Sequence, residues 1–190
     1  MKSKLSSRAL FICCLFAVSL GGPTDALLAE GFTVGGPFPA FTLPAPDSSE
    51  VQNYLGLKTM APFTIADVRA KIVLLEFMDA FCTQCLANAP ALNRLYKVIQ
   101  EDAALSKDVK ILAIAIGNTK AQADAFKKNS KVPFPIFPDD KLAIAEVVEL
   151  TGTPTMVLVS KDGKTLSCHR GTIKDFDAFL KELREVYKAQ

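Results

Sequence analysis

Two cysteines three positions apart carry the strongest chemical signal in the sequence. Cys82 and Cys85 follow an almost continuously apolar run at residues 72–78 and precede a segment whose apolar residues recur at helical spacing. This pattern predicts a buried strand that leads into a helix beginning near Cys82. Unpaired N–H groups and the positive dipole end at a helix N-terminus favour thiolate over thiol. We therefore predict that Cys82 is a nucleophile and that Cys85, about one helical turn further on, can close a disulfide with it.

Glu76 interrupts the apolar run that leads to the cysteines. Burying a carboxylate is costly unless it has a partner or a function. If the side chain points beneath the disulfide, burial would raise its pKa and it could pass a proton to or from Cys85. The alternative is a strand-end residue that reaches solvent or pairs with a lysine. Asp79 is close enough in sequence to compete for the proton-transfer role, and we favour Glu76.

A zinc site is the structural alternative for the two cysteines. Zinc normally takes four ligands, and the only other cysteine or histidine residues after the N-terminal segment are Cys168 and His169. Neighbouring residues on a strand point to opposite faces, so these two cannot easily turn to one metal. We therefore predict redox chemistry and no metal site. Cys168 shares strand parity with Leu166, which predicts a buried, inert thiol and an outward-facing His169.

The remaining elements would hold these residues on one sheet. Besides the run at 72–78, apolar patterns predict strands at 109–116, 155–159 and 165–169, the last two joined by an Asp162-Gly163 turn. Because a strand, a helix and a parallel strand form a right-handed crossover, these elements can share a sheet. The order β-α-β-α-α-β-β-α predicts an α/β fold, in which a mixed sheet carries helices on both faces.

Capping residues indicate where the later helices begin. Three helices are predicted: 120–129 after a Thr119/Gln122 capping box, one through residue 150 after Asp139 or Asp140, and one after a Thr172/Asp175 capping box. Residues 38–43 predict an edge strand, where proline is tolerated. Residues 132–138 are extended and rich in proline, and residues 47–59 form an insertion of weak helical character to which we assign no chemistry.

The N-terminal segment has the pattern of an export signal. Lys2, Lys4 and Arg8 precede an apolar run at residues 9–20, and Gly-Gly-Pro-Thr-Asp-Ala then breaks it. This predicts a signal peptide at residues 1–26, with cleavage between 21 and 29, a domain at residues 30–190, and a periplasmic or otherwise exported location. An uncleaved membrane anchor is the alternative, although a spanning helix needs about 20 apolar residues. Cys13 and Cys14 would leave with the signal.

Composition sets broad limits on function. The chain has 190 residues, of which 49% are hydrophobic and 22% charged, which fits one globular domain with a sizeable core. The net charge of +2 favours no particular partner, and no basic block is interleaved with aromatic residues, so we predict no nucleic-acid binding. Membrane contact is expected only through a retained N-terminal segment, and we expect a monomer.

Around the cysteines and near residue 154 the sequence resembles the thioredoxin superfamily, and within it the periplasmic thiol-disulfide oxidoreductases of the TlpA/ResA type. The matching segments are Glu76-Phe-Met-Asp-Ala-Phe-Cys82-Thr-Gln-Cys85, Pro90 five residues later, and Gly152-Thr-Pro154-Thr. The resemblance spans the chain from about residue 38 to its end. The chain departs from the family pattern at two places. Phe81 stands before the first cysteine, where the family usually has Trp. Thr83-Gln84 stand between the cysteines, where the family usually has Pro before the second. Since the intervening dipeptide helps to set the redox potential, the direction of electron flow stays open.

The resemblance implies a thioredoxin-like fold and an exported enzyme that reduces protein disulfides by dithiol-disulfide exchange. It implies a cis peptide bond at Pro154 and an acid at the position of Glu76. No bound cofactor is expected, and the partners would be protein thiols or disulfides and an upstream electron donor. The expected catalytic residues are Cys82, Cys85 and Glu76, and the expected substrate contacts are Thr153, Pro154, Phe81, Thr83 and Gln84. Pro90 should only kink the helix.

Three other functions compete with this one. A thiol peroxidase is suggested by residues 132–138, but peroxiredoxins carry Pro-x-x-x-Thr-x-x-Cys, and Leu75 and Asp79 occupy the Pro and Thr places here. A copper carrier of thioredoxin fold would space its cysteines differently and add a histidine ligand. A redox-silent binding module is disfavoured because both cysteines are present.

Overall fold

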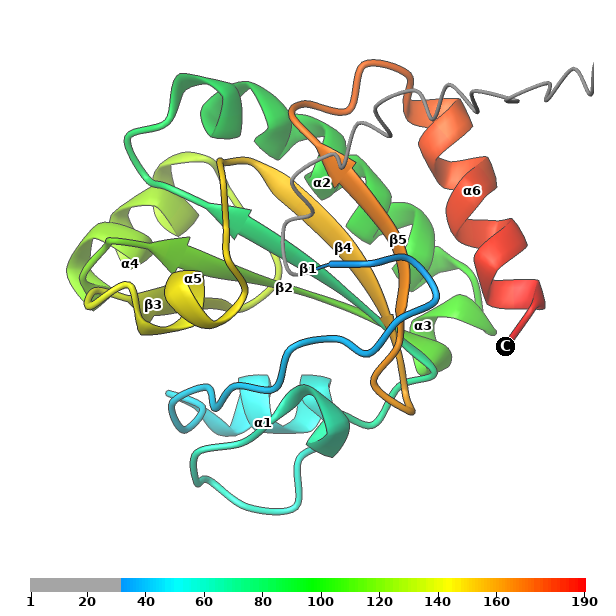
Figure 1. Ribbon diagram of the computed structural model, residues 1–190, viewed down its shortest axis with the longest axis horizontal. Coiled ribbons are helices and arrows are strands. Elements are labelled where there is room, and N and C mark those ends of the chain that lie inside the picture. The colour runs from blue at the N-terminus through cyan, green and yellow to red at the C-terminus, as the bar shows by residue number, and fades with distance from the viewer. Residues whose placement is uncertain (1–31) are drawn as a thin grey trace, which may run out of the picture.

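A five-stranded mixed sheet forms the centre of the protein (Figure 1), in the order β3-β2-β1-β4-β5. The computed structural model describes residues 32–190, so the predicted signal segment at 1–26 lies outside the described residues. β1, β2 and β3 are parallel, whereas β4 runs antiparallel to β1 and β5 antiparallel to β4. The strands are β1 Ile72–Met78, β2 Val109–Ile116, β3 Ile136–Asp139, β4 Thr155–Ser160 and β5 Thr165–Arg170.

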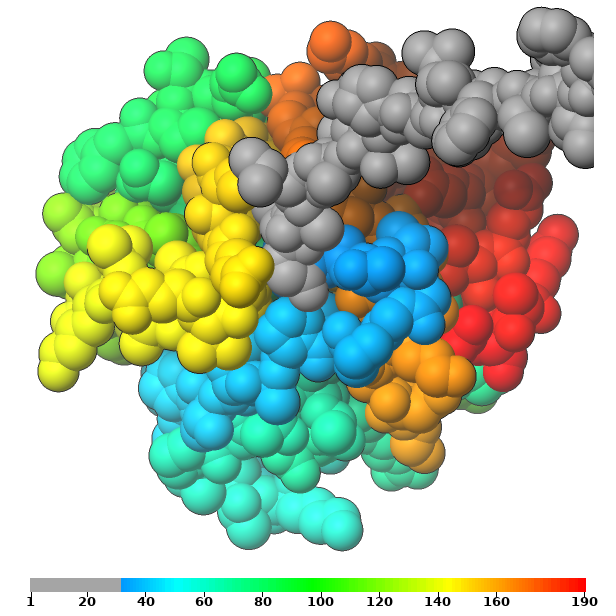
Figure 2. Space-filling model, viewed as in Figure 1, coloured from blue at the N-terminus to red at the C-terminus, as the bar shows by residue number. Residues whose placement is uncertain are grey.

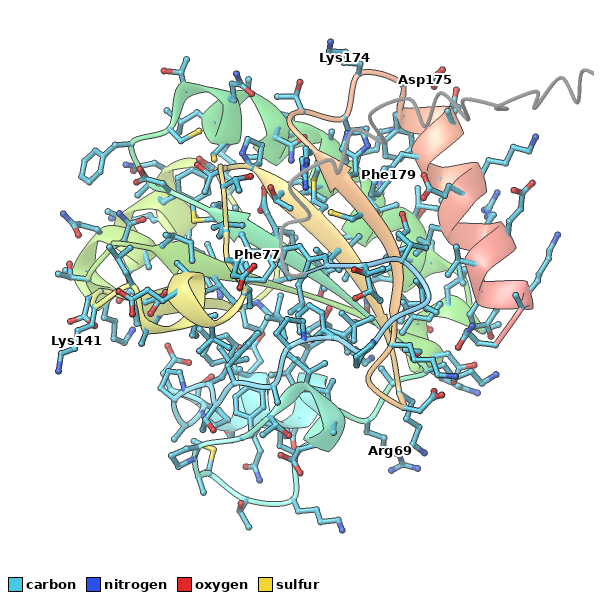
Figure 3. All side chains as sticks on the ribbon, viewed as in Figure 1. Arg69, Phe77, Lys141, Lys174, Asp175 and Phe179 are labelled. Atoms are coloured by element: carbon cyan, nitrogen blue, oxygen red, sulfur yellow. The ribbon has the colours of Figure 1, made fainter. Side chains whose placement is uncertain are left out.

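Helices cover both faces of the sheet. One apolar cluster packs α2, α3, α4 and α6 against one face, and a second packs α1, α5 and the first described segment, blue in Figure 2, against the other. Phe179 of α6 and Phe77 of β1, labelled in Figure 3, lie in the first and the second cluster respectively. The helices are α1 Ser49–Leu55, α2 Thr83–Glu101, α3 Leu105–Asp108, α4 Lys120–Asn129, α5 Ala143–Val147 and α6 Phe176–Lys188, with a 3-10 turn at Ile65–Asp67.

Alternation along β1 decides which side chains face α2. Ile72, Leu74 and Met78 belong to the α2 cluster, whereas Val73, Leu75 and Phe77 belong to the opposite cluster. Because side chains alternate along a strand, Glu76 faces α2. The predicted strand at 72–78, the strand at 109–116 and the helix at 120–129 are all confirmed.

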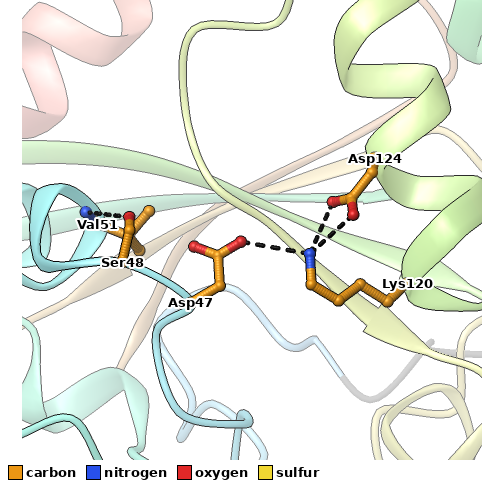
Figure 4. A network of polar contacts seen from close by, with 5 residues as sticks. All are labelled: Asp47, Ser48, Val51, Lys120 and Asp124. Carbon is orange, nitrogen blue, oxygen red and sulfur yellow. Dashed lines mark hydrogen bonds and ion pairs between the residues drawn. The ribbon is translucent and has the colours of Figure 1, made fainter.

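The predicted insertion at residues 47–59 contains α1 and is joined to α4 by a small polar network (Figure 4). Lys120 Nζ lies 3.4 Å from an Asp47 carboxylate oxygen and 2.8 Å from one of Asp124. Ser48 accepts a hydrogen bond from the Val51 N–H at 3.2 Å and so caps α1. These contacts are exposed and contribute little stability. Leu55 and Leu57, which are buried in the second apolar cluster, hold the insertion against the sheet.

Prolines account for two differences from the sequence prediction. The edge strand predicted at 38–43 is absent, and only isolated bridges form, at Pro37 and Leu43. Proline at 37 and 39 supplies no N–H to a ladder. In the opposite sense, the proline-rich segment at 132–138 was not predicted to pair, yet Ile136–Asp139 forms β3 at the edge of the sheet, where Pro138 is tolerated.

Helix boundaries depart from prediction at two places. The N-cap of α5 is Leu142 rather than Asp139 or Asp140, although the Asp139 carboxylate accepts the N–H groups of Ile144 and Ala145 in the first turn. The helix ends at Val147 rather than near 150. The Thr172/Asp175 capping box is wrong, because Asp175 is itself the N-cap and accepts the Ala178 N–H at 2.9 Å.

A β-bulge overturns the predicted orientation of Cys168. The pairing of β4 with β5 shifts between Leu158 and Val159, and one extra residue of β5 is accommodated there. Leu166 therefore packs on the α2 side, whereas the half-buried Cys168 packs against the opposite cluster. His169 does not face outward as predicted, since its ring meets that of Phe179 with centroids 5.5 Å apart.

Within the described residues, no helix is both long and apolar enough to cross a membrane.

Candidate active site

Cys82 lies at the junction between the central strand and the first long helix. It is the N-cap of α2, and its Sγ accepts the Cys85 N–H at 3.3 Å. The same sulfur lies 3.5 Å from the Thr153 carbonyl oxygen, to which the thiol can donate. Cys82 is partly exposed, whereas Cys85 is fully buried. The Cys82 sulfur is therefore accessible to another molecule, whereas the Cys85 sulfur is shielded behind it.

The two thiols differ in acidity. Partial burial would by itself raise the pKa of Cys82, but hydrogen bonds from the Cys85 and Thr153 side chains and from the N–H groups of Cys85 and Gln84 outweigh burial, and the pKa is lowered. Burial, followed by the hydrogen bond with Cys82, raises the pKa of Cys85 to about 12. Cys82 therefore forms a thiolate readily, and Cys85 keeps its proton until a base removes it.

Glu76 lies inside the protein on the face of β1 that α2 covers. Its side chain is 3% exposed, and its Oε1 accepts a hydrogen bond from Asn88 Nδ2 at 3.2 Å. Burial raises the pKa of Glu76 to about 7, although the Asn88 bond acts in the opposite direction. The alternative of a strand-end carboxylate that reaches solvent is therefore wrong. At neutral pH the group can both accept and donate a proton.

Asn88 was missed by the sequence reasoning. It is buried on α2, one turn after Cys85, and its Nδ2 also lies 3.2 Å from the Met156 Sδ. Its Oδ1 accepts the Ile173 N–H at 2.9 Å, which ties α2 to the loop before α6. An amide in the otherwise apolar face of α2, three residues after Cys85, is the signal that could have identified it.

A second asparagine orders the loop that carries Cys82. Asn118, which follows β2, donates to Asp79 Oδ1 at 3.0 Å and accepts the Ala80 N–H at 2.8 Å. Asp79 Oδ1 also accepts the Phe81 N–H, and the Asp79 carbonyl accepts the Cys82 N–H. Asp79 is thus engaged in holding the loop rather than in competing with Glu76. Because the carboxyl ends of parallel strands meet at one edge, the position of Asn118 after β2 was the available signal.

The remaining predicted site residues surround Cys82. The Thr153-Pro154 bond is cis, and Pro154 directly precedes β4. Phe81 is 70% exposed, and Thr83 and Gln84 are exposed at the start of α2. The helix continues through Pro90 to Glu101.

The part of the chain that the structure describes contains no group of three or more His, Cys, Asp or Glu side chains placed to hold a metal ion.

Comparison with known proteins identifies relatives of this arrangement. The model of the AhpC/TSA family matches residues 34–166. The thiol-disulfide oxidoreductase ResA of Geobacillus thermodenitrificans is 29% identical over 113 residues, which are 60% of this chain and 62% of that protein. The chain therefore covers less than two thirds of the length of this relative. The ResA of Bacillus subtilis is 26% identical over 58% of this chain and 59% of its own length.

Solved structures show the same fold. The thioredoxin domain of a thiol-disulfide oxidoreductase from Bacteroides vulgatus superposes with a TM-score of 0.61 at 18% identity, covering 81% of this chain and 97% of that one. The predicted thioredoxin-like fold is confirmed, as is the predicted resemblance to ResA-type redoxins.

Proposed function

The chain belongs to the AhpC/TSA family, and we propose that it is an exported thiol-disulfide oxidoreductase that reduces disulfide bonds in other proteins. The observation that carries this proposal is the arrangement at the start of α2. A partly exposed Cys82 sulfur accepts the Cys85 N–H, and Cys85 is buried directly behind it. Protein disulfides and thiols are the partner class, as the names of the ResA relatives suggest.

The proposed reaction is a pair of exchanges at sulfur. The Cys82 thiolate attacks one sulfur of the partner disulfide, so that a mixed disulfide forms and the other partner sulfur leaves as a thiolate and takes up a proton. Cys85, once deprotonated, attacks Cys82 Sγ and releases the first partner sulfur, which is protonated in turn. Two electrons pass to the partner and a Cys82–Cys85 disulfide remains. An upstream dithiol donor must then reduce this disulfide, and the exchange itself needs no bound cofactor.

The second exchange needs a base for Cys85. Its pKa of about 12 leaves little thiolate at neutral pH, whereas the pKa of Glu76 is about 7. Cys85 and Asn88 lie one turn apart on the buried face of α2, and Asn88 holds the Glu76 carboxylate. We assign Glu76 the role of receiving the Cys85 proton, directly or through a water.

Partner binding is assigned to the residues around Cys82. Phe81, Thr83 and Gln84 offer exposed surface, and Thr153 offers backbone groups beside the sulfur. An extended partner strand could pair with this backbone in the manner of β-strand addition. Export is proposed from the pattern at residues 1–26, and a periplasmic or otherwise oxidising location fits a redox-active cysteine pair.

Turnover of a protein disulfide tests the proposal. The reduced domain, residues 30–190, should reduce the interchain disulfides of insulin when a dithiol donor is supplied, and Cys82→Ser should abolish this. Cys168→Ser, which changes a cysteine outside the site, is the matched control and should retain activity. A protein that consumes hydrogen peroxide but leaves insulin disulfides intact would instead be a thiol peroxidase.

A further inference from the structure

A groove of about 650 Å³ opens beside the cysteine-bearing loop, at the edge of the sheet where β1 and β2 end. The loop from α5 to β4 forms one wall, and Figure 1 shows this loop reaching the same edge as the start of α2. Thr153, whose carbonyl lies 3.5 Å from Cys82 Sγ, lines the groove. The larger apolar side chains that line it are Phe81, Ile116, Leu142 and Leu150. A polypeptide whose disulfide reaches Cys82 would therefore lie along it.

The groove is negatively charged. Glu146 and Glu149 are exposed on its α5 side, and Asp79 lies on the other. Of the described residues that line it, none is Lys, Arg or His. Asp79 already accepts hydrogen bonds from Phe81 and Asn118. The two glutamates are therefore the carboxylates available to an incoming partner.

Although the net charge of the chain is low, the two ends of the parallel strands carry opposite charges. A second groove lies where β1 and β2 begin, and is lined by Lys71 and Asp108 among others. Its lining includes six Lys or Arg residues and two Asp residues. A cationic segment would thus be attracted to the end of the molecule that holds Cys82 and repelled from the other.

Backbone geometry singles out the same wall. Among the described residues, three that are not glycine have a left-handed backbone, namely Lys131, Leu142 and Glu149. The last two bracket α5 and line the groove. Leucine is disfavoured at a φ of 60°, which glycine or asparagine adopts readily. Leu142 is nevertheless 44% exposed, and its Cδ2 lies over Gly117 in the groove wall. An unfavourable residue with an exposed side chain is typical of a position used for binding.

We propose that this groove selects the partner of Cys82: it binds an extended segment that carries a Lys or Arg opposite Glu146 and Glu149 and an apolar side chain against Leu142 and Phe81. The inference rests on the proposed disulfide exchange and names its substrate class. The partner is thus a protein whose disulfide is flanked by a cationic and partly apolar stretch. Acidic or purely polar flanks are disfavoured.

Matched peptides test this selection. Four peptides with the same intramolecular disulfide differ only in the two residues after the second cysteine, which are Lys-Leu, Glu-Leu, Lys-Ser or Glu-Ser. Each is reduced by the pre-reduced protein, and the rate constant is divided by that for dithiothreitol to remove intrinsic differences in reactivity. We expect Lys-Leu to exceed Glu-Leu by about tenfold at low salt and by less at high salt, because exposed charges are screened.

Variants locate the selection within the groove. The double variant Glu146→Gln/Glu149→Gln should reduce the Lys-over-Glu preference to about threefold or less. Its control is Glu101→Gln/Glu185→Gln, which removes the same charge from exposed helix positions and should retain the preference. Leu142→Asn should weaken the Leu-over-Ser preference without lowering the melting temperature, since asparagine tolerates the left-handed backbone.

The outcomes separate the two proposals. If the normalised rates are equal for all four peptides, or if the Glu146→Gln/Glu149→Gln variant keeps the full preference, the groove proposal is overturned while disulfide exchange stands. If no peptide is reduced, the proposed function falls and the selection with it.

Discussion

Replacing Glu76 by Gln should change how the stability of the protein depends on pH. On folding, the pKa of this carboxyl rises from 4.5 to about 7 because the group is buried. The folded state therefore binds the proton more tightly than the unfolded state. Stability from this group is complete below pH 4.5 and is lost as the pH rises through about 7. At about 1.4 kcal/mol per pH unit, the loss amounts to about 3 kcal/mol.

Glutamine has the shape of the protonated acid and cannot ionise, so the variant lacks this loss. The free energy of unfolding, measured in urea at several pH values between 4.5 and 8.5 with the cysteines kept reduced, should fall less steeply for Glu76→Gln than for the wild type. Relative to the wild type, the free energy of unfolding of Glu76→Gln should therefore increase by about 3 kcal/mol from the lowest to the highest pH of this range. Glu101→Gln, which alters an exposed acid on α2, should follow the wild-type curve.

Parallel curves for the wild type and Glu76→Gln would refute the reasoning, because they would show that Glu76 titrates alike in the folded and unfolded states. The same variant should slow the release of the partner from the mixed disulfide, since the proposed acceptor of the Cys85 proton is gone. The first attack by Cys82 should be affected much less, which a rapid-mixing measurement of the two phases can establish.

Three further changes follow from the contacts around the cysteines. Asn88→Leu removes the hydrogen bond to Glu76, so the pKa of that carboxyl, followed by NMR, should rise further above its usual range. The free energy of unfolding should also fall by about 1–3 kcal/mol, because the Ile173 N–H loses its acceptor. Asn118→Ala should destabilise the fold by a similar amount, about 1–3 kcal/mol, because the Ala80 N–H loses its acceptor. It should also lower the rate at which Cys82 attacks a disulfide, because the loop that carries Cys82 is less ordered. Alkylation of Cys82 by iodoacetamide should reach half its maximal rate below pH 9, the ordinary thiol value, and buried Cys85 should stay unmodified in the folded protein.

The strand-to-helix junction could be predicted because it is a local property of the sequence. The change from a continuous apolar run to helical spacing at Cys82 fixes β1, the start of α2 and the exposure of one sulfur. The burial of Glu76 could be inferred for the same reason, since it stands within that run. In each case neighbours in the chain supply the structural context.

Features that depend on distant contacts could not be predicted in this way. Asn88 and Asn118 act through partners 12 to 85 positions away, and nothing near them in the sequence names those partners. The bulge in β5 inverts the side chains after Leu166, so that parity counted along the strand gives the wrong face for Cys168. β3 was missed because Pro138 within it, and Pro133 and Pro135 just before it, obscure a strand that pairs only at the sheet edge.

Trapping of the mixed disulfide is the most direct test of the exchange at Cys82. Cys85→Ser, incubated with a disulfide-bonded protein, should accumulate a covalent complex, and peptide mapping by mass spectrometry should place the linkage at Cys82. The wild type should pass through this complex without accumulating it, and Cys82→Ser should form none. A complex linked through Cys168, or equal trapping by both serine variants, would contradict the account.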